Sequence, residues 1–191
     1  MDETFDWVVV GSGAGSFASA LVMAAAGKSV LILEKTGLIG GTTAKSGGVM
    51  WVPGNCFMAA DGEPDSLEAA ETYLDALQVL DGNPAPGSTP EKRRAFLTHA
   101  PKAIDFLLEQ GIRLRRGPAF WPDYYDEQPG GCKTTRTVVA EPFNLKELGD
   151  LYDAWVTRSD AEEAEKKAIA DARRHAPRQH QFQRPAEVAR R

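Results

Sequence analysis

The stretch "VVVGSGAGSFASAL" at residues 8–21 decides the fold of the amino-terminal part of this chain. Three valines lead into a turn with glycines at positions 11 and 13, and small and apolar residues follow. This order is typical of a strand, a tight turn and a helix whose first amide groups bind a pyrophosphate. The fingerprint G-x-G-x-x-G has a third glycine, which here is replaced by Ser16. The surrounding sequence must therefore decide whether this turn binds a nucleotide.

The residues on either side of the turn predict a compact βαβ unit. The β-branched run at 5–10 predicts a buried parallel strand. Residues 14–26 predict a helix that ends at Gly27, and residues 29–34 predict a second strand. The fold class expected from this order is α/β, with a Rossmann-like domain and an incomplete parallel sheet.

An acid closes the second strand, where a dinucleotide site needs one. Glu34 follows Gly11 by 23 positions, and a carboxylate there accepts hydrogen bonds from ribose hydroxyls and disfavours the 2′-phosphate of NADP. Because the third fingerprint position needs only a small residue for helix–strand packing, Ser16 is compatible with the site. The alternative is a glycine-rich turn that opens an ordinary α/β unit.

A second glycine-rich loop, "EKTGLIGGTTAKSGG" at 34–48, favours FAD over NAD. Its backbone groups and hydroxyls could line the path of a diphosphate toward a flavin ring, whereas a nicotinamide enzyme has no evident need for them. The alternative is a flexible linker. The predicted cofactor-binding residues are Gly11, Ser12, Gly13, Ala14, Gly15, Ser16, Glu34, Lys35, Gly40, Gly41, Thr42, Thr43, Ser46, Gly47 and Gly48.

Further along the chain the pattern predicts helical additions. Residues 65–80 have apolar positions near helical spacing, and residues 89–111 begin with a threonine cap and a proline. Pro101 is expected to divide the second segment into two helices. The "RLRR" run at 113–116 is expected to form an exposed turn, and one strand is expected at 135–140.

The character of the chain changes near residue 150. We expect residues 1–150 to be the amino-terminal part of an FAD-binding domain and residues 151–191 to form a charged helical or disordered tail. Residues 166–191 hold eight Lys or Arg against two acids. A basic tail of this kind is usually solvated, but it could also dock an acidic partner.

Composition excludes several classes of protein. The net charge of −5 argues against binding of nucleic acid over the whole surface. Two separate cysteines and three scattered histidines predict neither a disulfide framework nor a metal site. The acidic start and the lack of a long apolar run predict a cytoplasmic protein with no membrane span.

Four motifs together resemble the FAD-dependent fumarate reductase/3-ketosteroid 1-dehydrogenase flavoproteins, and the ketosteroid branch more closely. They are "VVVGSGAG", "LEK", "GGTTAKSGGVMWVPGN" and "WPDYYDEQPGG", and the resemblance covers about residues 5–150. The first two motifs are shared widely among flavoproteins, whereas "SGGVMWVP" and "WPDYY" are narrower. The resemblance implies an FAD-dependent oxidoreductase of steroid metabolism acting on a steroid-like ketone.

For ketosteroid dehydrogenases the resemblance implies transfer of a C1 hydride to flavin N5 and removal of a C2 proton by a tyrosinate base. Within "WPDYY" it implies that Tyr124, or less closely Tyr125, hydrogen-bonds that base and favours its ionised form. A tyrosine with a pKa near 10 needs such help at neutral pH. The alternative is that Trp121, Tyr124 and Tyr125 pack a loop over the core.

Family members have a much longer chain, whose later parts supply further active-site residues. We therefore expect a truncated chain with weak FAD affinity and little activity by itself, because a short parallel sheet leaves an edge open. Two alternatives stay open: a related flavoprotein acting on an unsaturated acid, and a nucleotide-binding module with a basic docking tail. The electron acceptor and the oligomeric state are not predicted by the sequence.

Overall fold

The structure, a computed structural model, describes residues 3–78 and 86–152. These residues belong to two compact units. The first unit comprises residues 3–45 and 148–152, and the second comprises residues 46–78 and 86–147. The tail expected after residue 150, with its helix and its basic residues, lies almost wholly outside the described residues.

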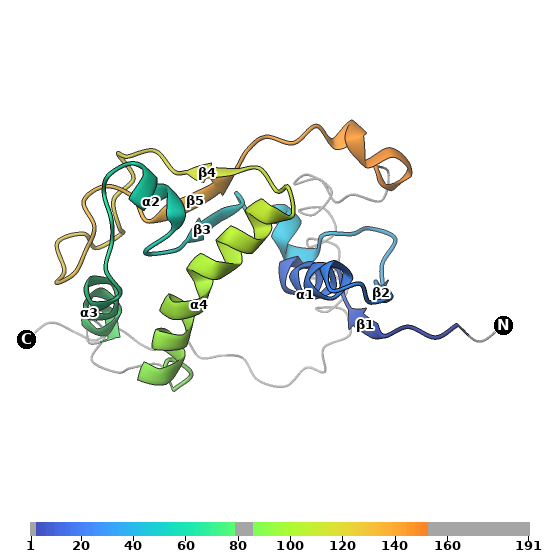
Figure 1. Cartoon of the computed structure of the whole chain (residues 1–191), viewed down its shortest axis with the longest axis horizontal. Helices are drawn as coiled ribbons and strands as arrows, with labels where there is room; N and C mark the ends of the chain where they lie inside the picture. The colour runs from blue at the N-terminus through green and yellow to red at the C-terminus, as the bar shows by residue number, and fades with distance from the viewer. Residues whose placement is uncertain (1–2, 79–85, 153–191) are drawn as a thin grey trace, which may run out of the picture. The chain divides into compact units, whose positions relative to one another are not determined.

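The first unit contains the predicted βαβ arrangement. Strand β1 (Trp7–Val10) and strand β2 (Val30–Leu33) pair in parallel, with Trp7 opposite Val30 and Val10 opposite Leu33. Helix α1 (Ala14–Ala25) connects them and contacts both (Figure 1). The α/β class and the short parallel sheet predicted from the sequence are thus confirmed.

Residues 5–10 were predicted to form a buried strand, and the prediction of burial is wrong. The side chains of Val8 and Leu33 are half exposed, and Val10 is 80% exposed. The described sheet of the first unit has two strands, so that α1 can cover only one of its faces. Apolar side chains on the other face stay open to solvent, although their sequence is typical of a strand buried on both faces.

The second unit is built on an antiparallel sheet. Strand β5 (Thr137–Ala140) lies between β3 (Val49–Trp51) and β4 (Leu114–Arg116). The predicted strand at 135–140 is confirmed as β5, whereas β3 was not predicted. The exposed turn expected at 113–116 is wrong, because Leu114 is buried and pairs with Ala140.

Three helices accompany this sheet: α2 (Cys56–Ala60), α3 (Leu67–Gln78) and α4 (Pro90–Glu109). The predicted start of α4 is confirmed, since the hydroxyl of Thr89 accepts a hydrogen bond from the backbone N–H of Lys92 at 3.4 Å. The predicted break at Pro101 is wrong. One helix continues through it, because proline removes a single hydrogen bond while Leu97 and Ile104 on either side are buried.

The core of the second unit lies between α4 and the sheet. Its buried members are Val52, Ile104, Leu114 and Val138, and partly buried apolar residues pack around them. Two 3₁₀ segments, η1 (Gly41–Lys45) and η2 (Leu145–Leu151), complete the described elements. Among the residues that the structure describes, no helix is long and apolar enough to cross a membrane.

Candidate functional site

The glycine turn after β1 is fixed to the end of β2 by its backbone. Gly11 has a φ of +92°, a conformation that side chains rarely allow, and its N–H donates a 2.7 Å hydrogen bond to the carbonyl of Leu33. The turn therefore opens toward α1 right beside the residue that follows β2, which is Glu34.

Ser12 joins three parts of the site through one hydroxyl. Its Oγ donates a 2.5 Å hydrogen bond to Oε2 of Glu34 and accepts a 2.9 Å hydrogen bond from the N–H of Gly40. The residue is only 2% exposed. Its hydroxyl is thus engaged with the predicted ribose-binding acid on one side and with the second loop on the other.

The carboxylate of Glu34 is held at both oxygens. While Oε2 accepts from Ser12, Oε1 accepts from the N–H and the hydroxyl of Thr36, at 3.1 and 3.2 Å. The hydrogen bond from Ser12 and then that from the backbone of Thr36 lower the pKa of Glu34 below its usual value. The group is therefore ionised at neutral pH and acts as a hydrogen-bond acceptor.

The second loop folds onto the first turn of α1. The hydroxyl of Thr43 accepts a 2.9 Å hydrogen bond from the N–H of Ala14, the first residue of that helix. Gly41 has a φ of +52°, and a Cβ built on it would lie 3.6 Å from the backbone of Gly13. The two glycine-rich loops thus pack closely and are joined by hydrogen bonds from the N–H groups of Ala14 and Gly40 to hydroxyls of the other loop, which a flexible linker does not require.

These contacts bring together two complementary kinds of group. The N–H of Ala14 is bound by Thr43, but the next amides of the first turn of α1 also lack partners one turn earlier in the helix, and the helix dipole adds positive potential there. An ionised carboxylate lies at the end of β2. Donors for a diphosphate and an acceptor for ribose hydroxyls therefore occur in one unit, and they fit the adenosine diphosphate half of FAD.

The remaining predicted cofactor residues have different surroundings. The hydroxyl of Ser16 donates to the carbonyl of Val10 at 3.3 Å, so it packs the helix against the strand. A Cβ at Gly15 would meet no atom within 4 Å, and Lys35 is exposed. The 3₁₀ segment η1 contains Thr42, whereas Ser46, Gly47 and Gly48 belong to the second unit.

The predicted catalytic tyrosine lies on an irregular segment of the second unit. Tyr124 is 100% exposed, and Trp121 and Tyr125 are each more than 40% exposed. Phe120 meets Trp121 edge to face at 6.3 Å. This exposure contradicts the alternative in which Tyr124 packs a loop over the core.

A buried ion network beside this segment was not predicted. Arg136 donates to both carboxylate oxygens of Asp65, at 2.7 and 2.9 Å, and to Asp123 at 2.7 Å. Burial lowers the pKa of the Arg136 guanidinium and its bonds to Asp65 raise it, with a rise as the net result. A local signal exists only for Asp123, which stands inside "WPDYY"; Arg136 follows it by 13 residues and follows Asp65 by 71 residues.

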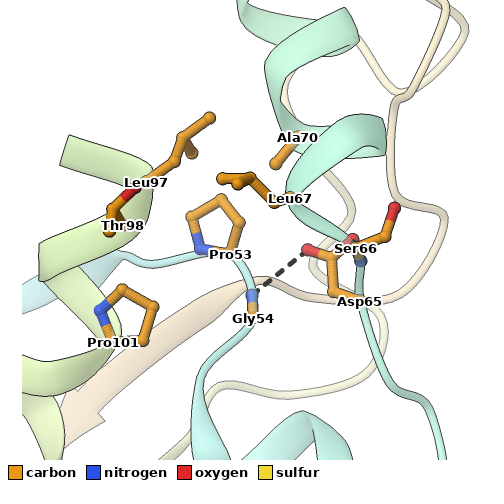
Figure 2. Close-up of a pocket in the computed structure, with 9 residues that line it drawn as sticks. All are labelled: Pro53, Gly54, Asp65, Ser66, Leu67, Ala70, Leu97, Thr98 and Pro101. Atoms are coloured by element: carbon orange, nitrogen blue, oxygen red, sulfur yellow. Dashed lines mark hydrogen bonds between the residues drawn. The ribbon is translucent and has the colours of Figure 1, made fainter. Parts of the chain in front are cut away.

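A pocket of about 250 Å³ opens between α3 and α4 (Figure 2). Leu67, Leu97 and Pro101 are among its apolar lining residues, and Asp65 is the charged residue that lines it. The Asp65 carboxylate is already engaged by Arg136 and by the N–H of Gly54 at 3.3 Å. This pocket therefore offers a ligand no free charge. The described residues also include no group of three or more His, Cys, Asp or Glu that could hold a metal ion.

Comparison with known proteins gives a family match and several relatives. The model of the family "FAD binding domain" matches residues 6–189. A 3-oxosteroid 1-dehydrogenase of Mycobacterium tuberculosis is 37% identical over 150 residues, 77% of this chain and 25% of that protein. A 4-oxocyclohexanecarboxylate 2-dehydrogenase of Sinomonas cyclohexanicum is 39% identical over 160 residues, 83% of this chain and 26% of that protein.

A solved structure is also similar. The 3-ketosteroid Δ1-dehydrogenase of Sterolibacterium denitrificans, in complex with 1,4-androstadiene-3,17-dione, matches with a TM-score of 0.69 and 34% identity. The match covers 82% of this chain and 26% of that one. The chain thus spans about a quarter of the length of the relatives that it matches. These findings confirm the predicted resemblance, the FAD cofactor and the oxidoreductase family.

Proposed function

Because this chain belongs to the FAD binding domain family, we propose that it holds the adenosine diphosphate end of FAD in a dehydrogenase. The proposed reaction introduces a C=C bond next to a ketone, as in 3-ketosteroid 1-dehydrogenases. The observation that best supports this proposal is the position of the ionised Glu34. Its carboxylate accepts a hydrogen bond from Ser12, in the turn before α1, and the same hydroxyl accepts one from the second loop.

Each residue of the site has a distinct task in this proposal. Glu34 accepts hydrogen bonds from the ribose hydroxyls, and its charge repels a 2′-phosphate. The amides of the first turn of α1 that follow Ala14 bind the diphosphate. Gly11 permits the tight turn, and Gly13 lets the backbone come close to the diphosphate, where a side chain would stand in the way. When bound, FAD accepts the hydride that the substrate loses.

Tyr124 is proposed to serve the proton transfer of the same reaction. Its phenol would hydrogen-bond a tyrosinate base and favour the ionised form of that base. The full exposure of Tyr124 supports this role, because the hydroxyl is open to a partner group. The proposed substrate is a planar ring ketone related to the ketosteroids.

A second substrate class is favoured by one relative. The 4-oxocyclohexanecarboxylate 2-dehydrogenase is as similar to this chain as the 3-oxosteroid enzymes are. Its substrate carries a ketone on a single ring with a carboxylate. A small ring ketone with an acid group is therefore the second candidate.

Cofactor binding is tested by titrating the chain with FAD and following the quenching of flavin fluorescence. We expect weak, saturable binding that is lost in Glu34→Ala and unchanged in Glu3→Ala, where an exposed acid of the same unit is removed. NADP should not compete. Binding that is equal in wild type and Glu34→Ala contradicts the proposed cofactor site.

The substrate class is tested by dye reduction with a 3-ketosteroid and with 4-oxocyclohexanecarboxylate, in the presence of saturating FAD. We expect little or no turnover by this chain alone. Stoichiometric yellow flavin with steroid-dependent dye reduction would overturn that expectation. The two substrates are therefore also compared in a full-length relative that carries this sequence as its amino-terminal part, where turnover with the carboxylate and none with the steroid would favour the second candidate.

A further inference from the structure

The segment that carries the exposed aromatic residues has no helix or strand. We call residues 117–134 the aromatic segment; its exposed rings are Phe120, Trp121, Tyr124 and Tyr125. Large apolar rings in solvent are unusual unless they meet a ligand or a partner. An irregular segment of this length would also lose much conformational entropy on ordering, so something must fix its backbone.

Asp123, the residue next to Tyr124, provides that fixation. Its Oδ1 accepts a 2.7 Å hydrogen bond from the indole N–H of Trp51 in β3. Its Oδ2 accepts a 3.0 Å hydrogen bond from the N–H of Cys132. The N–H of Asp123 donates in turn to the carbonyl of Cys132 at 3.0 Å. The two ends of the loop around Tyr124 are thus joined at one carboxylate.

A second tie follows on the other side of Tyr124. The N–H of Tyr125 donates a 3.3 Å hydrogen bond to the hydroxyl of Tyr73 in α3. Burial raises the pKa of the Tyr73 phenol, which therefore stays protonated. The backbone is consequently held immediately before and immediately after Tyr124, while the Tyr124 side chain itself is free.

The buried side chain of Arg136 donates a hydrogen bond to Asp123. Its side chain is 2% exposed, that of Asp123 is 1% exposed and that of Asp65 is 6% exposed. The guanidinium lies 5.8 Å from the ring centre of Trp51 and 5.7 Å from that of Tyr73. The guanidinium is therefore held in one orientation by the two carboxylates that it binds and by the two rings beside it.

The charges of this network are costly to bury. Well-packed apolar side chains often give equal or greater stability than a buried ion pair, so such a pair is better explained by a specified geometry than by stability. We propose that Arg136 is a positioning residue: it fixes the backbone before Tyr124 through Asp123, and it supports the backbone after Tyr124 through its contact with the ring of Tyr73. The inference rests on the proposed function, in which Tyr124 serves the reaction.

The first test is hydrogen exchange of the backbone amides, measured on the full chain. In Asp123→Asn and Arg136→Gln, we expect the amides of Asp123, Tyr125 and Cys132 to exchange at least tenfold faster, with those of α4 unchanged. Arg136→Lys should restore part of the protection, because it keeps one charged donor. The matched control is Asp75→Asn, which removes a carboxylate that Arg93 binds at 2.6 Å outside the segment.

Two outcomes of this experiment would overturn the proposal. One is unchanged exchange of the three amides in Asp123→Asn. The other is an equal acceleration throughout the second unit, since the network would then only hold that unit together. Neither outcome depends on binding of FAD or of a substrate, so the proposed function is tested separately.

A second readout follows Tyr124 itself. In protein labelled with 3-fluorotyrosine, the ¹⁹F resonance of Tyr124 is assigned by Tyr124→Phe among the four tyrosines. We expect 1,4-androstadiene-3,17-dione to shift it in wild type and not in Asp123→Asn. Equal shifts in the two proteins overturn the positioning role. A steroid that shifts neither resonance counts against the proposed function.

Discussion

The two units hold their chemically active groups by opposite means. In the first unit, a backbone amide and two hydroxyls bind the carboxylate of Glu34, and the strands stay largely open to solvent. In the second unit, a buried guanidinium and two buried carboxylates lie beside an apolar core. A site formed by a short turn and local hydrogen bonds needs only a small hydrophobic core. An irregular segment, by contrast, adopts one conformation only when buried side chains fix its backbone.

The largest effect on stability is expected from adding a methyl group where the second unit has no room for it. Gly130 and Gly62 both have a φ of +76°, so that alanine strains the backbone equally at the two positions. A Cβ at Gly130 would collide with the carbonyl of Ala69 and lie 2.8 Å from the nitrogen of Tyr73, whereas at Gly62 it would meet nothing. We expect Gly130→Ala to lower the free energy of unfolding by about 3 kcal/mol or more, and Gly62→Ala by about 1 kcal/mol.

Urea denaturation followed by tryptophan fluorescence measures this difference. Equal losses in the two variants would mean that the backbone of the aromatic segment can move away from α3. The segment would then be far less rigid than its contacts indicate, and the contrast between the two units would weaken.

A smaller effect is expected at the centre of the first unit. Ser12→Ala leaves Oε2 of Glu34 and the N–H of Gly40 without their common partner. We expect the Kd for FAD to rise about tenfold, roughly 1.4 kcal/mol, the loss typical of a hydrogen bond to a charged group. The control is Ser16→Ala, whose hydroxyl has only a 3.3 Å contact with the carbonyl of Val10. It should change the Kd less than twofold, and equal effects in the two variants would contradict the role of Ser12.

The smallest effect concerns pH. The folded state lowers the pKa of Glu34, so the stabilisation by its hydrogen bonds is complete above the ordinary glutamate pKa of about 4.3. It is lost as the pH falls through the lower folded value. Carboxyl ¹³C NMR should give a pKa below the ordinary value in wild type, and a higher pKa in Ser12→Ala. An identical titration in the two proteins would show that Ser12 does not hold the carboxylate.

The same contrast explains what could be predicted from the sequence. The βαβ unit and the order of its turn, acid and loop are local, and steric rules for glycine and strand propensity reveal them within 40 residues. The exposure of Val10 was not predictable, because strand composition does not tell how many strands surround it. The helix break predicted at Pro101 does not occur for a related reason, since tertiary packing around Ile104 outweighs the loss of one helical hydrogen bond.

The network around Arg136 was missed because nothing near it in sequence indicates burial. An arginine within "TTRTVV" is usually read as a solvated side chain, and the carboxylate that binds it with two bonds lies 71 residues earlier. Likewise, β3 and β4 are three residues each and pair with β5 across long separations. Residues such as Asp123 can be suspected from a motif, but their partners follow only from the fold.

The spacing of these contacts has a consequence for the order of folding. The hydrogen bonds at and near Ser12 join residues that are 22 to 29 positions apart in the sequence, whereas Arg136 and Asp65 are 71 positions apart. Closing longer loops costs more entropy and slows folding. On the ribosome the nucleotide turn can therefore form once residue 45 has emerged, whereas the support of Tyr124 must wait for residue 136. A folding intermediate with an ordered nucleotide turn and an unformed aromatic segment is the kinetic signature that this difference predicts.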